Sequence, residues 1–515
     1  MSVDDLGVAV SAGALVLLVA VGAVRLSTRT GTPSLLLYLA LGIGLGESGV
    51  GIRFEDYELT TSLGYAALAL ILAEGGLTTR WSTIRRSVAP AALLATVGTG
   101  VSVVVVAVAG HWLLGIPWVQ SFLLGAVLAS TDAAAVFSVL RVVPLPRRLA
   151  GMLEAESGFN DAPVVILVVA LSAAADGEDL HSPFLVVGEA ALELAGGTLL
   201  GLGLGWLGAR MLRGVALPSS GLYPIAVLAF CALAWGAGQV LHVSGFIAVY
   251  LAALVLGNAD LPHRPTVRGF AQGLGWLAQI GLFVLLGLLV SPSDLPDQVL
   301  PALVVGTVLL LVARPLSVLA SVSWLGFGWR DQAFLSWAGL RGAVPIVLAT
   351  IPVTLAAPGT DGLFELVFVL VVVFTLVQAP TLPRVARWLR LAADTPLDLE
   401  IESSPLTEID AHVLTVAVGP GSRLHGLEVF ELRLPTGAAV TLVVRDGTSL
   451  VPQPRTTLRR GDQLMVVCPG PVRQATETRL HQLSTRGRLA QWRARPRSGR
   501  GARPARGEDA PSHGR

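Results

Sequence analysis

The segment SGFND carries the side chains with the clearest potential for chemistry, because it opens a long apolar stretch. Ser157 and Asp161 are four residues apart, so a helix places them on one face, while Glu156 and Asn160 share the adjoining face. Pro163 lacks the amide proton that a helix requires, which loosens the helix beside Asp161. A dry environment disfavours a bare carboxylate, and either a proton or a bound cation neutralises it. We therefore expect a proton and a cation to compete for Asp161.

A second polar segment, STDAAAVF, interrupts the preceding apolar stretch. Its Ser, Thr and Asp side chains offer the backbone hydrogen bonds that compete with a helix. A helix broken here would turn free carbonyl groups and the hydroxyl of Thr131 toward an ion. These oxygen atoms suit Na⁺ or K⁺, so the pattern predicts a monovalent cation site at Asp132 and Asp161. Glu74 ends the apolar run LILAEGGL, where it is either a further ligand or an interfacial residue.

Two arginines also fall inside apolar stretches, where ionisable groups are costly and indicate function. Arg314 lies near the centre of its stretch, and Arg341 is flanked by glycines and by Pro345, which leaves the carbonyl of Arg341 without its helical donor. Neither guanidinium group readily loses its proton, so each needs a buried anion. The available partners are Asp132, Asp161 and Glu156. Such pairs either serve transport or are structural only.

The composition of the chain indicates that these ionisable side chains belong to a membrane protein. A chain of 515 residues with 53% hydrophobic residues, 14% charged residues and a mean hydropathy of +0.70 has too little polar surface for a soluble globule, which indicates a polytopic membrane protein. Cys231 and Cys468 form no CxxC pair, so they suggest neither a disulfide framework nor a thiolate metal site. Asp4 and Asp5 stand where a signal peptide is basic, so we expect residues 6–26 to be a retained first helix.

Apolar runs between polar links predict about thirteen membrane helices before residue 390. They are expected near residues 6–25, 33–50, 60–79, 88–109, 118–140, 153–175, 184–212, 222–241, 243–258, 268–290, 299–324, 331–354 and 362–388. The sequence has no lysine, and its arginines gather in alternate links, with Arg53 as the exception. Because basic residues in short loops stay in the cytoplasm, the amino terminus is expected outside and the carboxy terminus inside the cell (plasma or inner) membrane.

The character of the chain changes after residue 390. We expect four parts: an all-α exchanger domain at 1–390, an acidic linker at 391–402, a small α+β cytosolic module at 403–484 and a disordered basic tail at 485–515. In the module, β-type runs begin at His412, Ala438 and Gln463 and are separated by turn signals. It lacks a GxGxxG motif. The tail is either a solvated terminus or a contact for anionic lipid.

Three motifs occur in an informative order: STDAAAVF at 130–137, EAESGFNDAPV at 154–164 and GLRGAVPI at 339–346. With them, nearly all of residues 1–390 resembles the monovalent cation/proton antiporter superfamily, specifically its NhaP-like branch. The resemblance implies thirteen helices in two inverted repeats and a core that moves like an elevator against a dimerisation domain. It also implies two crossed, discontinuous helices, which would hold Thr131 with Asp132 and Arg341.

The same resemblance implies roles for individual residues. Asp161 would carry the ion or the proton. Its helpers would be Asp132, Thr131, Ser157 and Glu74. Asn160 and Glu156 would shape access, and Arg314 would pair with Glu156. Electrogenic relatives have a second aspartate where this sequence has Asn160, which favours electroneutral exchange.

Residues 402–470 resemble the TrkA-C module, also called the RCK carboxy-terminal module. That family consists of dimeric cytosolic regulatory domains that sometimes bind a nucleotide. A nucleotide effector is therefore one expectation, although no residue of this sequence can be assigned to it, and a dimerisation or stability module is the alternative. The resemblance shifts the expected cation toward K⁺.

Two other classes of membrane protein would also use intramembrane carboxylates. An aspartyl protease would use Asp132 and Asp161 as an acid/base pair, but no GxGD follows and the two arginines would have no use. A cation channel would need a filter loop such as TVGYG, which the sequence lacks. The sequence therefore predicts a secondary antiporter, not an enzyme, that exchanges K⁺ or Na⁺ for H⁺ in cytoplasmic pH and cation homeostasis. We expect a homodimer in contact with membrane lipid, without a resident cofactor and without a nucleic-acid partner.

Overall fold

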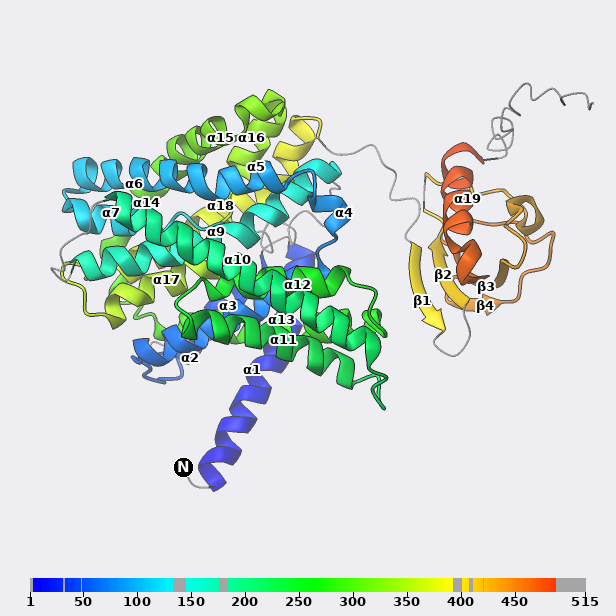
Figure 1. The fold of residues 1–515 in the computed structure, drawn as a ribbon, viewed down its shortest axis with the longest axis horizontal. Coiled ribbons are helices and arrows are strands. Elements are labelled where there is room, and N and C mark those ends of the chain that lie inside the picture. Colours follow the sequence, from blue (N-terminus) through cyan, green and yellow to red (C-terminus); the bar gives the residue numbers. More distant parts are fainter. Residues whose placement is uncertain are drawn as a thin grey trace, which may run out of the picture. The chain divides into compact units, whose positions relative to one another are not determined.

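The computed structural model describes residues 3–30, 33–47, 49–132, 145–175, 183–391, 401–406, 411–419 and 421–487. The chain divides into two compact units, Met1–Ala393 and Asp394–Arg515 (Figure 1). The first unit is helical and the second contains a β-sheet. Much of the tail expected at 485–515, and residues 133–140 of the expected helix 118–140, lie outside the described residues.

The first unit is a bundle of apolar helices. Its helices are α1 (Val3–Thr30), α2 (Ser34–Leu45), α3 (Tyr57–Thr78), α4 (Trp81–Ile84), α5 (Val88–Leu93), α6 (Thr99–Leu114), α7 (Trp118–Val127), α9 (Arg147–Ala175), α10 (Pro183–Gly214), α11 (Leu222–Val240), α12 (Gly245–Asn258), α13 (Arg264–Leu289), α14 (Leu295–Val308), α15 (Arg314–Val322), α16 (Trp329–Trp337), α17 (Ala343–Thr354) and α18 (Leu363–Trp388). Among the described residues, eight helical stretches are long and apolar enough to cross a membrane, and five shorter apolar helices accompany them. The fold is therefore that of a mostly helical, multi-pass membrane protein.

Two groups of helices pack mainly among themselves. One contains α2, α3 and α10 to α13, and the other contains α5 to α7, α9 and α14 to α18. Small residues allow close approach within a group: a Cβ atom on Gly42 of α2 would collide with the backbone of α13, and one on Gly287 of α13 would collide with α2. The groups meet where α17 packs on α3 and where α9 packs on α10 and α12.

Two non-helical segments, which we call the interruptions, lie side by side. One is residues 130–132, which follow the end of α7 at Val127, and the other is residues 338–342, which separate α16 from α17. The amide of Asp132 donates to the carbonyl of Leu340 at 2.9 Å, so the two interruptions bond to each other. The span expected at 331–354 thus consists of two helices, with Arg341 in the non-helical segment between them. Pro345 falls in the first turn of α17, where its missing amide proton costs nothing.

The same order of elements occurs twice in this group. Among the described residues, a helix containing a π-helical turn, a helix that ends at one of these interruptions and a long helix follow one another as α5–α6, α7 and α9, and again as α14–α15, α16 and α18, with α17 before α18. The π-helical turns are η1 (Leu94–Gly98) and η2 (Leu309–Ala313). α9 begins at Arg147, earlier than the expected residue 153, and contains Pro163 without ending there.

The second unit is a five-stranded antiparallel sheet in the order β1-β2-β5-β3-β4. Its strands are β1 (Ile401–Leu406), β2 (Ala411–Ala417), β3 (Ala439–Arg445), β4 (Thr448–Leu450) and β5 (Gln463–Pro469). Helix α19 (Arg473–Arg486) buries Leu480 and Leu483 in one core with strand residues Leu414 and Val466 (Figure 1). The expected α+β class is therefore correct, although β1 begins inside the segment expected to be linker.

Candidate functional site

Asp161 lies on α9 with its side chain inside the first unit, where only 6% of the residue is exposed. Its Oδ1 accepts a hydrogen bond from the hydroxyl of Ser130 at 2.7 Å. Ser130 is fully buried at the interruption after α7. The sequence did not single out Ser130, although it is the first residue of the STD segment. A carboxylate held by one hydroxyl has remaining lone pairs for a proton or a cation.

Thr131 joins the interruption to the adjoining face of α9. Its hydroxyl accepts a hydrogen bond from Nδ2 of Asn160 at 2.7 Å and donates to Oε1 of Glu156 at 3.3 Å. All three residues are buried. The structure thus brings together three of the residues expected at the site and holds the Thr131 hydroxyl in a network of side chains.

Glu156 and Arg314 form a buried, bidentate ion pair. Nη1 and Nη2 of Arg314 lie 2.6 and 3.0 Å from the two carboxylate oxygens, and Nε donates to the carbonyl of Leu335 at 3.3 Å. A Cβ atom at position 339 would meet this guanidinium group, which accounts for Gly339 in the interruption before α17. The expected pairing of Arg314 with Glu156 is present in the structure.

Arg341 has partners that the sequence did not suggest. Its Nη1 donates to the carbonyl of Ala129 at 2.6 Å and also to the carbonyl of Ser130. The carbonyl of Arg341 accepts the hydroxyl of Thr375 at 3.1 Å. Carbonyl groups at the end of α7 have no helical donors and carry partial negative charge, so they attract a buried guanidinium group. The carbonyl groups of Ala129 and Ser130, which were expected to be free to face an ion, thus each accept a hydrogen bond from Arg341.

Asp132 connects the two interruptions through its side chain as well as its amide. A Cβ atom built on Gly342 would overlap the carboxylate of Asp132, so the two residues are in direct contact. Glycine is required at this position because any larger residue would displace the aspartate. The structure therefore places Asp132 and Arg341 in the two interruptions and Asp161 beside them.

Ser157 and Glu74 are the remaining expected residues. Ser157 is half-buried on the Asp161 face of α9, one turn earlier in the chain. Glu74 is half-buried on α3, lies against Gly275 of α13 and interacts electrostatically with Glu154 of α9. Glu74 thus lies between the two groups of helices.

Glu154 is a residue that the sequence alone did not identify. It precedes Asp161 by seven residues, which places both on one face of α9. The hydroxyl of Thr79 donates to it from the end of α3, and the side chain of Asn258 on α12 donates to the carbonyl of Thr79 at 2.9 Å. This network crosses between the two groups of helices. The only signal in the sequence was a second glutamate in EAESGFND.

Comparison with known proteins decides what this arrangement belongs to. Residues 14–388 match the family model described as sodium/hydrogen exchanger, transmembrane. The chain belongs to the sodium/hydrogen exchanger family. Residues 413–480 of this exchanger match the TrkA-C domain model.

Two relatives agree with this assignment, and a solved structure has a similar fold. The K⁺/H⁺ antiporter NhaP2 of Shewanella oneidensis is 38% identical over 475 residues, which cover 91% of this chain and 82% of the relative. The K⁺/H⁺ antiporter NhaP of Alkalimonas amylolytica is 36% identical over 459 residues, covering 88% and 79%. The structure of the sodium proton antiporter MjNhaP1 from Methanocaldococcus jannaschii is similar in fold, with a TM-score of 0.66 and 22% identity over 76% of this chain and 100% of that one.

The exchanger is therefore a multi-pass membrane protein that exchanges monovalent cations for protons. It is a secondary transporter and not an enzyme, so the alternative of an aspartyl protease is excluded. The family and the function predicted from the three motifs are confirmed.

Proposed function

We propose that the exchanger moves one monovalent cation, K⁺ in preference to Na⁺, against one proton, and that Asp161 binds each in turn. The charges around the interrupted helices support this stoichiometry. Three carboxylates, on Asp132, Asp161 and Glu156, face two guanidinium groups, on Arg314 and Arg341, which leaves one net negative charge. One proton or one monovalent cation neutralises it.

Neutrality matters because a net charge is costly in the membrane interior. The translocon scale assigns about 2.5–3.5 kcal/mol to a charged side chain at the centre of a membrane helix. Movement of a core that carries neither ion would therefore cost free energy for its net charge, whereas the form loaded with either ion is neutral. Asn160 supports this count, because an aspartate in its place would add a second uncompensated charge. The proposed exchange is therefore electroneutral.

The exchange cycle uses the geometry at Asp161. In the form that faces the cytoplasm, the protonated carboxyl group releases its proton and binds the cation, with Ser130 donating to Oδ1 and Asp132 nearby. Thr131 is positioned by Asn160 and Glu156. The loaded core then moves, the cation leaves on the other side and a proton returns to Asp161. The gradients set the direction.

We further propose the finer architecture on which this cycle depends. Thirteen helices would form two inverted repeats, supported by the repeated order of a helix with a π-helical turn, a helix that ends at one of the interruptions and a long helix. The helices at the two interruptions would be the crossed discontinuous helices. The group containing α9 would be the moving core, and the group containing α3 and α12 would be the dimerisation domain of a homodimer. The alternation of arginines in the links supports an outside amino terminus.

The choice of K⁺ rests on relatives, because the NhaP and NhaP2 proteins 36–38% identical to this chain are K⁺/H⁺ antiporters. The domains we propose are the exchanger at 1–390, the linker at 391–402, a regulatory module at 403–484 and the tail at 485–515. The TrkA-C match at 413–480 supports the regulatory module. The physiological task of the exchanger would be regulation of cytoplasmic pH and cation content.

Purified protein in proteoliposomes with a trapped pH dye tests the proposal. Addition of K⁺ or Na⁺ salts should move protons, most strongly with K⁺, whereas choline salts should not. An imposed membrane potential should leave the rate of proton movement unchanged. Asp161→Asn should be folded and silent, whereas Asp297→Asn, at an exposed position in the first turn of α14, should behave as wild type. Exchange by Asp161→Asn would disprove the role of Asp161, and a rate that follows the potential would disprove electroneutrality.

A further inference from the structure

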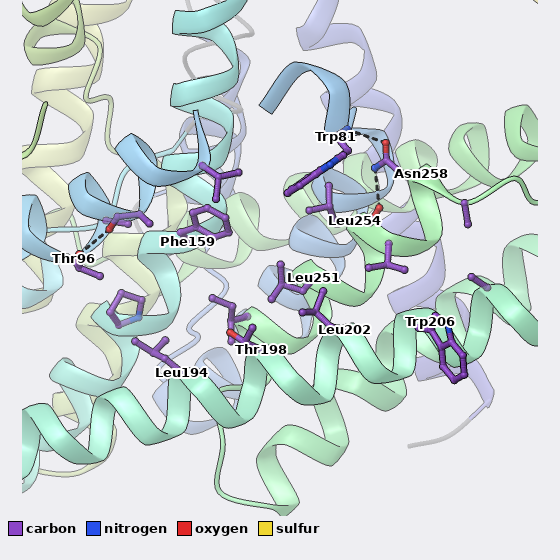
Figure 2. Close-up of a pocket in the computed structure, with 18 of the residues that line it drawn as sticks. Trp81, Thr96, Phe159, Leu194, Thr198, Leu202, Trp206, Leu251, Leu254 and Asn258 are labelled. Carbon is purple, nitrogen blue, oxygen red and sulfur yellow. Dashed lines mark hydrogen bonds between the residues drawn. The ribbon is translucent and has the colours of Figure 1, made fainter. Parts of the chain in front are cut away.

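A groove of about 670 Å³ lies between the two groups of helices, outside the ion site (Figure 2). Its volume is within the range of about 300–1,000 Å³ that is typical of ligand sites. Phe159 and Pro163 of α9 form part of one wall, and Ile247 and Leu251 of α12 form part of the opposite wall. The groove therefore touches the helix that carries Asp161 without including Asp161 among its lining residues.

The floor of the groove is one stripe along α10. It consists of Leu194, Thr198, Leu202, Trp206, Ala209 and Arg213. Their spacing of three or four residues places them on one face of the helix. At a rise of 1.5 Å per residue the stripe is about 28 Å long, close to the hydrocarbon thickness of a bilayer, about 30 Å. A groove with this length and apolar lining fits an extended acyl chain.

One end of the groove is polar. Arg213, in the last turn of α10, is exposed and, among the described residues that line the groove, is the one ionisable group. Trp81 and Asn258 also line the groove, and the amide of Trp81 donates to Oδ1 of Asn258 at 2.9 Å. Figure 2 shows Trp81 and Asn258 on the side of Trp206, away from Leu194. An arginine near a tryptophan is typical of the level of lipid headgroups.

We propose that this groove binds one anionic phospholipid, with an acyl chain along the α10 stripe and the phosphate on Arg213. The charge selects the occupant, because a single cationic group at the end of an apolar groove complements an anionic headgroup. The lipid would come from the leaflet on the side of Arg213. It would contact both groups of helices at once, through Phe159 and Pro163 on one side and through α10 and α12 on the other.

Native mass spectrometry of the purified full chain tests the proposal. The protein is first exchanged into vesicles of phosphatidylglycerol and phosphatidylcholine and then extracted in mild detergent. Wild type should retain one phospholipid per chain, mainly phosphatidylglycerol. Thr198→Phe should fill the groove and lower occupancy at least tenfold. Leu199→Phe, on a residue that is 73% exposed and outside the lining, should retain lipid as wild type does.

The arginine variant tests the headgroup separately from the chain. Arg213→Gln should still retain a phospholipid but lose the preference for phosphatidylglycerol, while Arg330→Gln, at an exposed position on α16, should keep it. Both arginines are exposed, so folding should be intact, as size-exclusion chromatography can check. Equal occupancy in Thr198→Phe and wild type, an unchanged preference in Arg213→Gln, or retention of detergent or fatty acid in place of phospholipid would overturn the proposal.

Discussion

The buried pair of Glu156 and Arg314 allows a quantitative test of how the core is held together. Both groups are almost fully buried, at 2% and 5% exposure, and two hydrogen bonds join them. Removing one partner leaves the other charge buried in a dry environment. The perturbation is therefore a cycle of three variants: Arg314→Met, Glu156→Leu and the double variant.

The expected magnitudes follow from burial. Breaking a buried pair by removing one partner costs about 3–5 kcal/mol, whereas replacing both with apolar residues of similar volume is often neutral or stabilising. In Arg314→Met, Glu156 keeps only the hydroxyl of Thr131 among the partners described above. In Glu156→Leu, the guanidinium group keeps the carbonyl of Leu335. Each single variant should therefore lose about 3–5 kcal/mol of unfolding free energy, and the double variant should lose less than either.

Unfolding of the purified protein by denaturant in detergent, followed by tryptophan fluorescence, measures these differences. The exposed carboxylate of Asp260 provides the control: it lies 3.5 Å from Arg264 and is 98% exposed, so Asp260→Asn should change stability little. If the losses of the two single variants added up in the double variant, the two charges would not depend on each other, and the reasoning from burial would be refuted.

Two further outcomes follow from single contacts. Gly342→Ala should abolish or strongly reduce exchange without unfolding the protein, because the new Cβ atom displaces the carboxylate of Asp132. Gly281→Ala is the control: its new Cβ atom meets no atom within 4 Å, so this variant should exchange as wild type does in the same proteoliposome assay. In the second unit, burial raises the pKa of Asp462, but hydrogen bonds, chiefly from Arg445, outweigh burial and hold the pKa below its ordinary value. The stabilisation from Asp462 is then present above the pKa of the unfolded chain, about 4, and is lost as the pH falls through the lower, folded value. Asp462→Asn should lower the unfolding free energy of this unit by about 1.5–3 kcal/mol at pH 7. Calorimetry should show the stability difference between wild type and variant shrinking below about pH 4. A stability difference that grows toward acid pH would contradict the stabilising role of the Asp462 carboxylate.

The helices and the motif residues could be predicted because both depend on local sequence. Apolar runs of about 20 residues predict membrane helices whatever their neighbours are. Ser157, Asp161, Glu156 and Asn160 share faces of one helix, and their spacing alone places them. The strand that begins at Ala411 could be predicted for the same reason, because its alternating apolar residues are a local pattern.

Contacts between distant segments could not be read in this way. Periodicity shows which face of a helix a residue occupies, but not which helix packs on that face. Ser130 became part of the site because α7 ends beside α9, and Thr79 reaches Glu154 only because α3 ends next to α9. From the residues alone the segment at 338–342 was expected as a loosened helix, and only the family resemblance implied a break there, because the break depends on the carbonyl of Leu340 finding the amide of Asp132.

Arg341 shows why these distant contacts matter for the chemistry. If the carbonyl groups freed after α7 faced the ion, they could form much of a coordination shell that a proton does not use. In the structure, the carbonyls of Ala129 and Ser130 accept hydrogen bonds from Arg341, and the hydroxyl of Thr131 accepts from Asn160 and donates to Glu156. In the proposed cycle, a cation would therefore depend more on the carboxylate oxygens of Asp161 than on these groups. Because the same oxygens would bind the proton, we expect Arg341 to strengthen the competition on which the proposed exchange depends.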